Sequence, residues 1–199
     1  MNQYFDNNEN LESNIKESYV KVLDTNFYLY TDNGVFNKSG LDFGTRVLLE
    51  NIDIINKKTF LDVGCGCGPI GIYILLNINN AQVDMIDINE RALKLTKMGL
   101  KKNRLNANVL KSDAYENITN KYDMIITNPP IRVGKKILYQ ILFDAKKYLN
   151  PHGHLICVIN KDQGAKSVVK DLEKEYKVEI LNKNKGFFVI DCIFSWQFV

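Results

Sequence analysis

Residues 61–71 read Leu61-Asp62-Val63-Gly64-Cys65-Gly66-Cys67-Gly68-Pro69-Ile70-Gly71 and join a short apolar run to a segment with helical spacing. Glycine adopts backbone conformations that other residues avoid, and without a Cβ it lets a ligand approach the main chain closely. A glycine-rich turn that opens a helix also points free N–H groups at that ligand. The stretch therefore predicts a strand, a ligand-binding turn and a helix, the first unit of a nucleotide-type α/β fold.

Strand-like and helix-like segments alternate after this turn. The apolar residues of 135–149, for example, recur at helical spacing and stop before Asn150-Pro151. Strands are predicted at 59–63, 82–86, 107–110, 122–127 and 154–159, two more flank the polar turn 182–186, and helices are predicted at 42–55, 70–78, 89–103, 135–149 and 162–175. We expect an α/β fold with a doubly wound, mostly parallel sheet that binds ligands at the carboxyl ends of its strands.

The N-terminal region differs from this alternating pattern. Residues 19–23 and 27–30 are strand-like on either side of the turn Asp24-Thr25-Asn26, which predicts a β-hairpin. A chain of 199 residues suits one ordinary α/β domain. We therefore divide it into an extension with a β-hairpin (1–45) and a single ligand-binding domain (46–199).

Composition narrows the classes of protein. The first 21 residues are polar and acidic, and no run approaches the roughly twenty apolar residues that span a bilayer, so we expect a cytoplasmic protein without a membrane anchor. The four cysteines form no Cys-x-x-Cys pair and are expected to be small buried residues. His152 and His154 have no carboxylate or thiol at ligand spacing, so no metal is expected.

A second motif, Asn128-Pro129-Pro130-Ile131, ends the apolar run 124–127. Two prolines remove two backbone donors, so the carbonyl oxygens of this turn are not used by a helix or sheet ladder. The residue before a proline is held extended, which aims the Asn128 side chain and the Pro129 carbonyl as two acceptors for an –NH2 group. Two acceptors on the hydrogens of a planar amine free its lone pair to attack a methyl group. The motif therefore indicates amine methylation. A tight loop after a buried strand is the alternative interpretation of this motif.

The glycine turn alone does not select its cofactor. A Gly-x-Gly-x-x-Gly pattern runs from Gly66 to Gly71, and Asp87 follows at the distance of a dinucleotide fingerprint. Asp62 ahead of the glycines favours S-adenosylmethionine instead, because a carboxylate there repels a pyrophosphate but holds an ammonium group directly or through water. In either interpretation Asp87 accepts the ribose hydroxyls. Asp113 either accepts from the adenine amine or caps a helix.

Several motifs together resemble a known family. They are Gly34-Val35-Phe36-Asn37-Lys38, Leu41-Asp42-Phe43-Gly44-Thr45-Arg46, residues 62–68, Asp87-Ile88-Asn89, Ser112-Asp113-Ala114, Asn128-Pro129-Pro130-Ile131-Arg132, Lys161-Asp162-Gln163-Gly164-Ala165 and Lys185-Gly186-Phe187. Through them the chain resembles the class I S-adenosylmethionine-dependent methyltransferases. Within these it resembles the methyltransferase small domain group, which includes bacterial small-subunit ribosomal RNA guanine-N2 methyltransferases. The resemblance implies a seven-stranded sheet whose last strand is antiparallel.

The motifs and the resemblance give a predicted set of site residues. The catalytic residues are Asn128, Pro129 and Pro130; the cofactor-binding residues are Asp62, Gly64, Gly66, Gly68, Asp87, Ile88, Asp113, Ala114 and Asn128; the substrate-binding residues are Phe36, Ile131, Arg132 and Lys135. Phe36 and Ile131 are candidate pocket walls, with ordinary core packing as the alternative. The best-known guanine-N2 enzymes differ in two ways: they carry a second, degenerate domain, and they often have an aromatic residue where Ile131 stands.

Charge bears on the substrate. Residues 1–90 hold 6 Lys/Arg and 13 Asp/Glu, net −7, whereas residues 91–199 hold 20 and 10, net +10. A basic half attracts a phosphate backbone, although lysines also occur on any solvated helix face. We predict N-methylation of a guanine N2 in 16S ribosomal RNA, with the RNA or the 30S subunit as partner. Methylation of a protein glutamine amide or of adenine N6, and a catalytically silent nucleic-acid-binding domain, are the alternatives.

Overall fold

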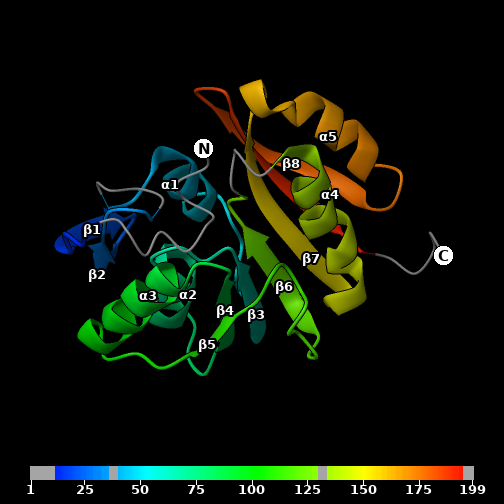
Figure 1. The fold of residues 1–199 in the computed structure, drawn as a ribbon. Coiled ribbons are helices and arrows are strands. Elements are labelled where there is room, and N and C mark those ends of the chain that lie inside the picture. Colours follow the sequence, from blue (N-terminus) through cyan, green and yellow to red (C-terminus); the bar gives the residue numbers. More distant parts are fainter. Residues whose placement is uncertain (1–11, 36–39, 130–133, 195–199) are drawn as a thin grey trace.

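The computed structural model describes residues 12–35, 40–129 and 134–194 (Figure 1). Its centre is a seven-stranded sheet with the order β5-β4-β3-β6-β7-β9-β8. The strands are β3 (Thr59–Val63), β4 (Gln82–Asp87), β5 (Asn108–Lys111), β6 (Tyr122–Thr127), β7 (Leu149–Asn160), β8 (Lys177–Asn184) and β9 (Phe187–Ile193). The first five are parallel, and β9 is antiparallel to both β7 and β8. The predicted fold class and the antiparallel last strand are confirmed.

Helices cover both faces of this sheet, as the alternation of buried side chains requires. Phe60, Met124 and Ile126 point to one face, where they pack with α1 (Phe43–Leu49), α2 (Pro69–Asn77) and α3 (Glu90–Lys102). Leu61 and Ile125 point to the other face and pack with α4 (Gly134–Asp144) and α5 (Ala165–Leu172). Strands buried on both faces are continuous apolar runs, which explains why the sequence marks them so clearly.

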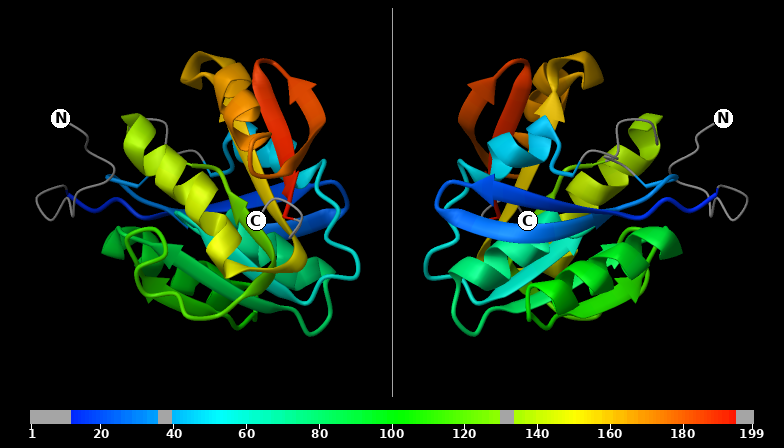
Figure 2. Two further views of the ribbon diagram at one scale, coloured as in Figure 1. Left: turned by 90° about the vertical axis from the view of Figure 1, so that its right-hand side faces the viewer. Right: turned by 90° about the vertical axis from the view of Figure 1, so that its left-hand side faces the viewer.

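The N-terminal hairpin consists of β1 (Lys16–Val22) and β2 (Thr25–Thr31). Its turn is Leu23-Asp24, with Leu23 at φ 49°, and not the predicted 24–26, because Thr25 and Asn26 already pair with Val22 and Lys21. The hairpin lies against α2 and α3, and its inward side chains belong to the same core as β3 (Figure 2). The boundary after residue 45 falls inside α1 and stays a prediction.

Three predicted helices are shorter in the structure, each for a local reason. The helix predicted at 42–55 ends at Leu49, because the Asn51 side-chain amide donates to the Val47 carbonyl (2.7 Å) in place of the next helical N–H. The helix predicted at 135–149 changes to a 3₁₀ turn (Ala145–Tyr148), because the Tyr176 hydroxyl inserts between the Leu142 carbonyl and the Lys146 N–H. The helix predicted at 162–175 is a 3₁₀ turn (Lys161–Gln163) followed by α5.

The 3₁₀ turn and α5 are separated at Gly164, whose φ of 82° is left-handed.

The closing hairpin also differs from its prediction. Residues 182–184 belong to β8, and the turn is only Lys185-Gly186, with both residues at positive φ. Two-residue hairpin turns need this conformation, so the polar composition of 182–184 reflects an edge strand and not a longer turn.

All four cysteines are free and buried, as predicted from their apolar surroundings. Within the part of the chain that the structure describes, no group of three or more His, Cys, Asp and Glu is arranged to hold a metal ion. No described helix is long and apolar enough to cross a membrane.

Candidate active site

The site lies where the chain reverses direction across the sheet. After β3 the chain forms β4 and β5 on one side, and it returns to form β6 on the other. A ligand crevice at the carboxyl ends of the strands is expected at such a switch point. The Thr127 hydroxyl at the end of β6 donates to the Val63 carbonyl at the end of β3 (2.8 Å), which brings the two sequence motifs together. A cavity of about 310 Å³ opens between them.

The glycine turn forms one wall of the cavity. Gly64 and Gly66 have positive φ values of 70° and 57°, and a Cβ built on Gly66 meets nothing within 4 Å. The two carboxylate oxygens of Asp87 accept from the N–H groups of Gly66 and Asn89 (both 2.9 Å). Burial raises the pKa of Asp87, against the effect of these hydrogen bonds. The turn thus presents backbone and an oriented acid to a ligand.

Asp62 lies beneath this turn and does not line the cavity. Its Oδ2 accepts from the Gly71 N–H (3.1 Å), whereas Oδ1 is buried and has no hydrogen-bond partner among the described residues. Burial raises the pKa of Asp62 to about 7. Gly68 also lies away from the cavity, because it begins α2 and packs on Met85 and Thr96. Direct contact of these two residues with a cofactor stays a prediction.

The next part of the cavity is largely apolar. Ile86, Ile88, Ile137 and Ile141 line it, and Ile88 is 40% exposed. Asp113 and Ala114 lie at its rim in a series of turns, so Asp113 does not cap a helix. Apolar side chains of this kind are typical of sites for a flat heterocycle, and the exposed side chain of Asp113 offers an acceptor at the edge of the cavity.

Asn128 and Pro129 line the opposite wall. The Asn128 amide nitrogen donates to Asp42 Oδ1 (3.1 Å) and to Thr45 Oγ1 (2.8 Å). No donor in the described ranges takes the amide oxygen, which is therefore available as an acceptor. Lys135 is exposed on the first turn of α4, outside the lining. The other predicted site residues, Phe36, Pro130, Ile131 and Arg132, lie outside the described residues.

Asp42 and Thr45 also line the cavity and were not among the predicted site residues. The sequence offers two signals for them: they belong to the motif 41–46 that contributes to the family resemblance, and the spacing Asp42-x-x-Thr45 is typical of a helix N-cap. The structure contains that cap: Asp42 Oδ1 accepts from the Thr45 N–H (3.0 Å) at the start of α1. Nothing local indicates that the same carboxylate reaches Asn128.

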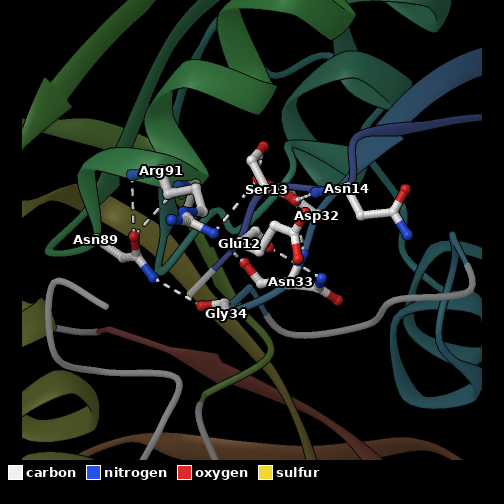
Figure 3. A network of polar contacts seen from close by, with 9 residues as sticks. Glu12, Ser13, Asn14, Asp32, Asn33, Gly34, Asn89 and Arg91 are labelled. Atoms are coloured by element: carbon white, nitrogen blue, oxygen red, sulfur yellow. Dashed lines mark hydrogen bonds and ion pairs between the residues drawn. The ribbon is translucent and has the colours of Figure 1, made fainter. Parts of the chain in front are cut away.

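A polar network fastens the N-terminal region to the start of α3 (Figure 3). Asp32 accepts from the Ser13 hydroxyl and from the backbone of Asn14 and Asn33, and it pairs with Arg91 at 3.5 Å. Burial opposes its charge, but these hydrogen bonds hold the pKa of Asp32 below its ordinary value.

The same network continues to the cavity. The Asn89 amide donates to the Gly34 carbonyl (3.1 Å), and the next residue, Val35, lines the cavity. Asn89 also caps α3 and bonds to Asp87, so one residue joins the N-terminal turn to the acid of the site. The hairpin extension is therefore part of the construction of the cavity.

A seven-stranded sheet of this order, with a glycine turn after β3 and an acid at the end of β4, defines the class I methyltransferase fold. Residues 26–191 match the methyltransferase small domain family. The chain therefore belongs to this family, a group of S-adenosylmethionine-dependent methyltransferases, and the resemblance inferred from the sequence is confirmed.

Similar proteins give the same result. A Bacillus subtilis protein called "Uncharacterized protein YbxB" is 34% identical over 192 residues, which cover 94% of this chain and 96% of that protein. The ribosomal RNA small subunit methyltransferase C of Haemophilus influenzae (strain PittEE) is 38% identical over 151 residues, 74% of this chain and 46% of that enzyme. The chain thus spans about half the length of the named methyltransferases that it matches.

Among solved structures, the T. thermophilus 16S rRNA N2 G1207 methyltransferase in complex with AdoMet and guanosine superposes with a TM-score of 0.78. The identity is 22%, and the match covers 90% of this chain and 50% of that chain. At this level of identity the likeness supports the shared fold.

Proposed function

We propose that the chain is a ribosomal RNA methyltransferase that transfers a methyl group from S-adenosylmethionine to a planar amine, most specifically the N2 amine of a guanine in 16S ribosomal RNA. One observation carries the proposal. The Asn128 amide nitrogen is fully engaged by Asp42 and Thr45, which leaves its oxygen as an acceptor in the same cavity as the glycine turn.

The hydrogen bonds of the glycine turn favour S-adenosylmethionine over a dinucleotide. Pyrophosphate binds at the N–H groups of such a turn and of the helix that follows. Here the Gly66 and Gly71 N–H groups already donate to Asp87 and Asp62. Both carboxylates would repel a phosphate, whereas Asp87 can accept from ribose hydroxyls and the unpartnered Asp62 oxygen can receive an ammonium group through water.

When bound, S-adenosylmethionine supplies a methyl group on a positively charged sulfur. Asn128 and the Pro129 carbonyl are proposed to accept the two hydrogens of the amine and to direct its lone pair at that methyl. As the N–C bond formed, the C–S electron pair would stay with sulfur, which would leave as a neutral thioether, and the positive charge would move to nitrogen, whose proton would then pass to solvent water. The acceptors stabilise that charge, so positioning and local electrostatics do most of the work without a titrating base.

Relatives and charge support RNA as the substrate. The Haemophilus influenzae relative is named for small-subunit ribosomal RNA, and residues 91–199 carry a net charge of +10. Arg132 and Lys135 follow Asn128 closely in the sequence and are proposed to meet phosphates that flank the target base. A 30S subunit or its precursor as partner implies that the protein acts in the cytoplasm.

The test is transfer in vitro. Purified protein and labelled S-adenosylmethionine are incubated with 30S subunits from cells that lack the gene, and the RNA is digested for nucleoside mass spectrometry. The proposal expects N2-methylguanosine at a stoichiometry near one per subunit. Label in N6-methyladenosine would mean that the substrate is an adenine, and label in a protein glutamine would mean that it is an amide. Absence of label from both the RNA and the ribosomal proteins would contradict the proposal.

A further inference from the structure

We infer that Asp42, acting with Thr45, is a positioning residue that fixes the orientation of the Asn128 amide and strengthens its oxygen as an acceptor. The inference rests on the proposed function, because it concerns the residue that receives the amine. It starts from four hydrogen bonds, two that join the end of β6 to the start of α1 and two within the cap of α1. They run from Asn128 Nδ2 to Asp42 and Thr45, and from the Thr45 N–H and hydroxyl to Asp42.

The direction of these hydrogen bonds leaves one arrangement. An ionised carboxylate only accepts, so Asp42 must receive hydrogens from its neighbours. The single hydroxyl hydrogen of Thr45 is donated to Asp42 Oδ2 (2.5 Å), and Thr45 Oγ1 can therefore only accept from Asn128. Asn128 must turn its nitrogen toward both, because its oxygen would meet two acceptors there. An unconstrained asparagine could present either end of its amide to the substrate.

The carboxylate does more than select an orientation. A negative group that accepts from an amide N–H polarises the amide. Electron density shifts away from the N–H, and the carbonyl oxygen at the other end becomes more negative. During transfer, positive charge moves from the cofactor sulfur to the substrate nitrogen. A carboxylate one hydrogen bond beyond the acceptor stabilises that charge on nitrogen, at the point where it develops.

The rest of the fold holds Asp42 at this place. Phe43 packs edge-on against Phe187 of β9, with ring centroids 5.6 Å apart. A Cβ on Gly44 would lie 2.9 Å from the Phe187 ring, so only glycine allows α1 to approach so closely. Thr45 is 3% exposed, which protects its hydrogen bonds from water. The last hairpin of the sheet thus supports a side chain that acts near its centre.

A purely structural role for Asp42 is the rival explanation, since it also caps α1. Asp42→Asn distinguishes the two roles. Asparagine caps helices as well as aspartate does, but it carries no charge, and its amide can donate as well as accept a hydrogen bond. Thr45→Val removes the hydroxyl at nearly constant shape, and Thr45→Ser restores it. Asp24→Asn, in the exposed hairpin turn, is a matched loss of charge away from the cavity.

The experiment combines kinetics with an NMR measurement that does not depend on activity. We expect Asp42→Asn to lower kcat at least about tenfold with KM and cofactor Kd within about threefold of wild type. In an Asn128→Ala background the same change should lower kcat by less than about threefold, because a residue that acts through Asn128 has nothing left to position. Thr45→Val should lower kcat less, and Asp24→Asn should leave it unchanged.

The side-chain NH2 signals of Asn128, assigned by their loss in Asn128→Ala, report orientation directly. We expect them to shift and to exchange faster with solvent in Asp42→Asn and Thr45→Val, and to return toward wild type in Thr45→Ser. Unmoved signals, or additive losses of kcat in the double variant, would overturn the inference. If wild-type protein transfers no methyl to 30S subunits, the proposed function fails, and the NMR signals still decide whether Asp42 orients Asn128.

Discussion

The two ends of the cavity are held together in different ways. At the glycine turn, Asp62 and Asp87 accept from backbone N–H groups that lie 9 and 21 positions away in the chain. At the opposite wall, Asn128 is held by the side chains of Asp42 and Thr45, which lie 86 and 83 positions away. The glycine-turn end, here called the cofactor end because the cofactor is proposed to bind there, is thus built from main-chain groups of one strand-turn-helix unit and its neighbour. The acceptor end, at Asn128, is built from side chains of distant elements.

This difference predicts two kinds of sensitivity. Backbone donors are supplied by any residue that can adopt the required conformation, so the cofactor end should depend on its glycines. A side-chain network depends on the donor and acceptor chemistry of each member, so the acceptor end should depend on individual polar groups. Variants at the two ends should therefore fail in different measurements, binding at one and turnover at the other.

The largest effect is expected at the cofactor end. Gly66→Val places a branched side chain in the open space over the turn and strains a residue at φ 57°, so cofactor binding should fall below detection in calorimetry. Wild type should bind S-adenosylmethionine and its demethylated product but not NAD.

Gly71→Ala is the matched control for that variant. Its Cβ would lie 2.5 Å from Met85 in the core, so it should lower the melting temperature, at a cost of about 1–3 kcal/mol, instead of blocking the ligand directly. Wild-type affinity in Gly66→Val would show that the turn does not meet the cofactor.

At the acceptor end, Asn128→Ala should lower turnover without a comparable change in cofactor affinity or melting temperature. The loss of one oriented acceptor should raise the barrier by about 2–4 kcal/mol, as the loss of an oxyanion-hole donor does. Single-turnover kinetics with 30S subunits, calorimetry and thermal unfolding measure the three quantities. An unfolded variant would instead identify Asn128-Pro129 as a structural turn.

The buried carboxylate of Asp62 gives the cofactor end of the cavity a pH dependence. Its pKa is raised by burial to about 7 in the folded chain, above its ordinary value of 3.8, so the folded state retains a proton that the unfolded state has lost. The stability contributed by protonated Asp62 is present at low pH and is lost as the pH rises toward 7.

Between pH 5.5 and 8 this should lower the free energy of unfolding of the cofactor-free protein by about 2 kcal/mol more in wild type than in Asp62→Asn. Urea unfolding at the two pH values measures the difference, and the comparison between the two proteins cancels the titration of groups that do not interact with Asp62. Identical pH profiles would mean that Asp62 stays ionised.

The smallest effect is expected outside the cavity. If Arg132 and Lys135 contact phosphates, replacing each with alanine should reduce the slope of log affinity for 30S RNA against log salt by about one unit, with cofactor binding unchanged. Lys177→Ala is the control, because Lys177 begins β8 at the other end of the sheet. Wild-type methylation by the double alanine variant across the salt range would favour an amide substrate.

Much of the fold was predictable from the sequence because its signals are local. The strand predicted at 59–63 is β3, and the alternation of apolar strands and amphipathic helices follows from burial on two faces of a sheet. The glycine turn and Asp87 were likewise predictable, since a strand-turn-helix unit fixes where its own backbone points. Asn128 was singled out by the two prolines that follow it.

Other features depended on contacts between residues far apart in the chain, and only the tertiary structure decided them. The Tyr176 hydroxyl ends α4 from 34 positions away, and the Leu23-Asp24 turn follows from the pairing register. Asp62 lies under the turn and not in the cavity because Gly71 binds it. Asp42 reaches Asn128 only because α1 packs on Phe187. Spacing along a sequence records which residues share a helix or a strand, but a hydrogen bond between distant side chains exists only once the whole chain has packed.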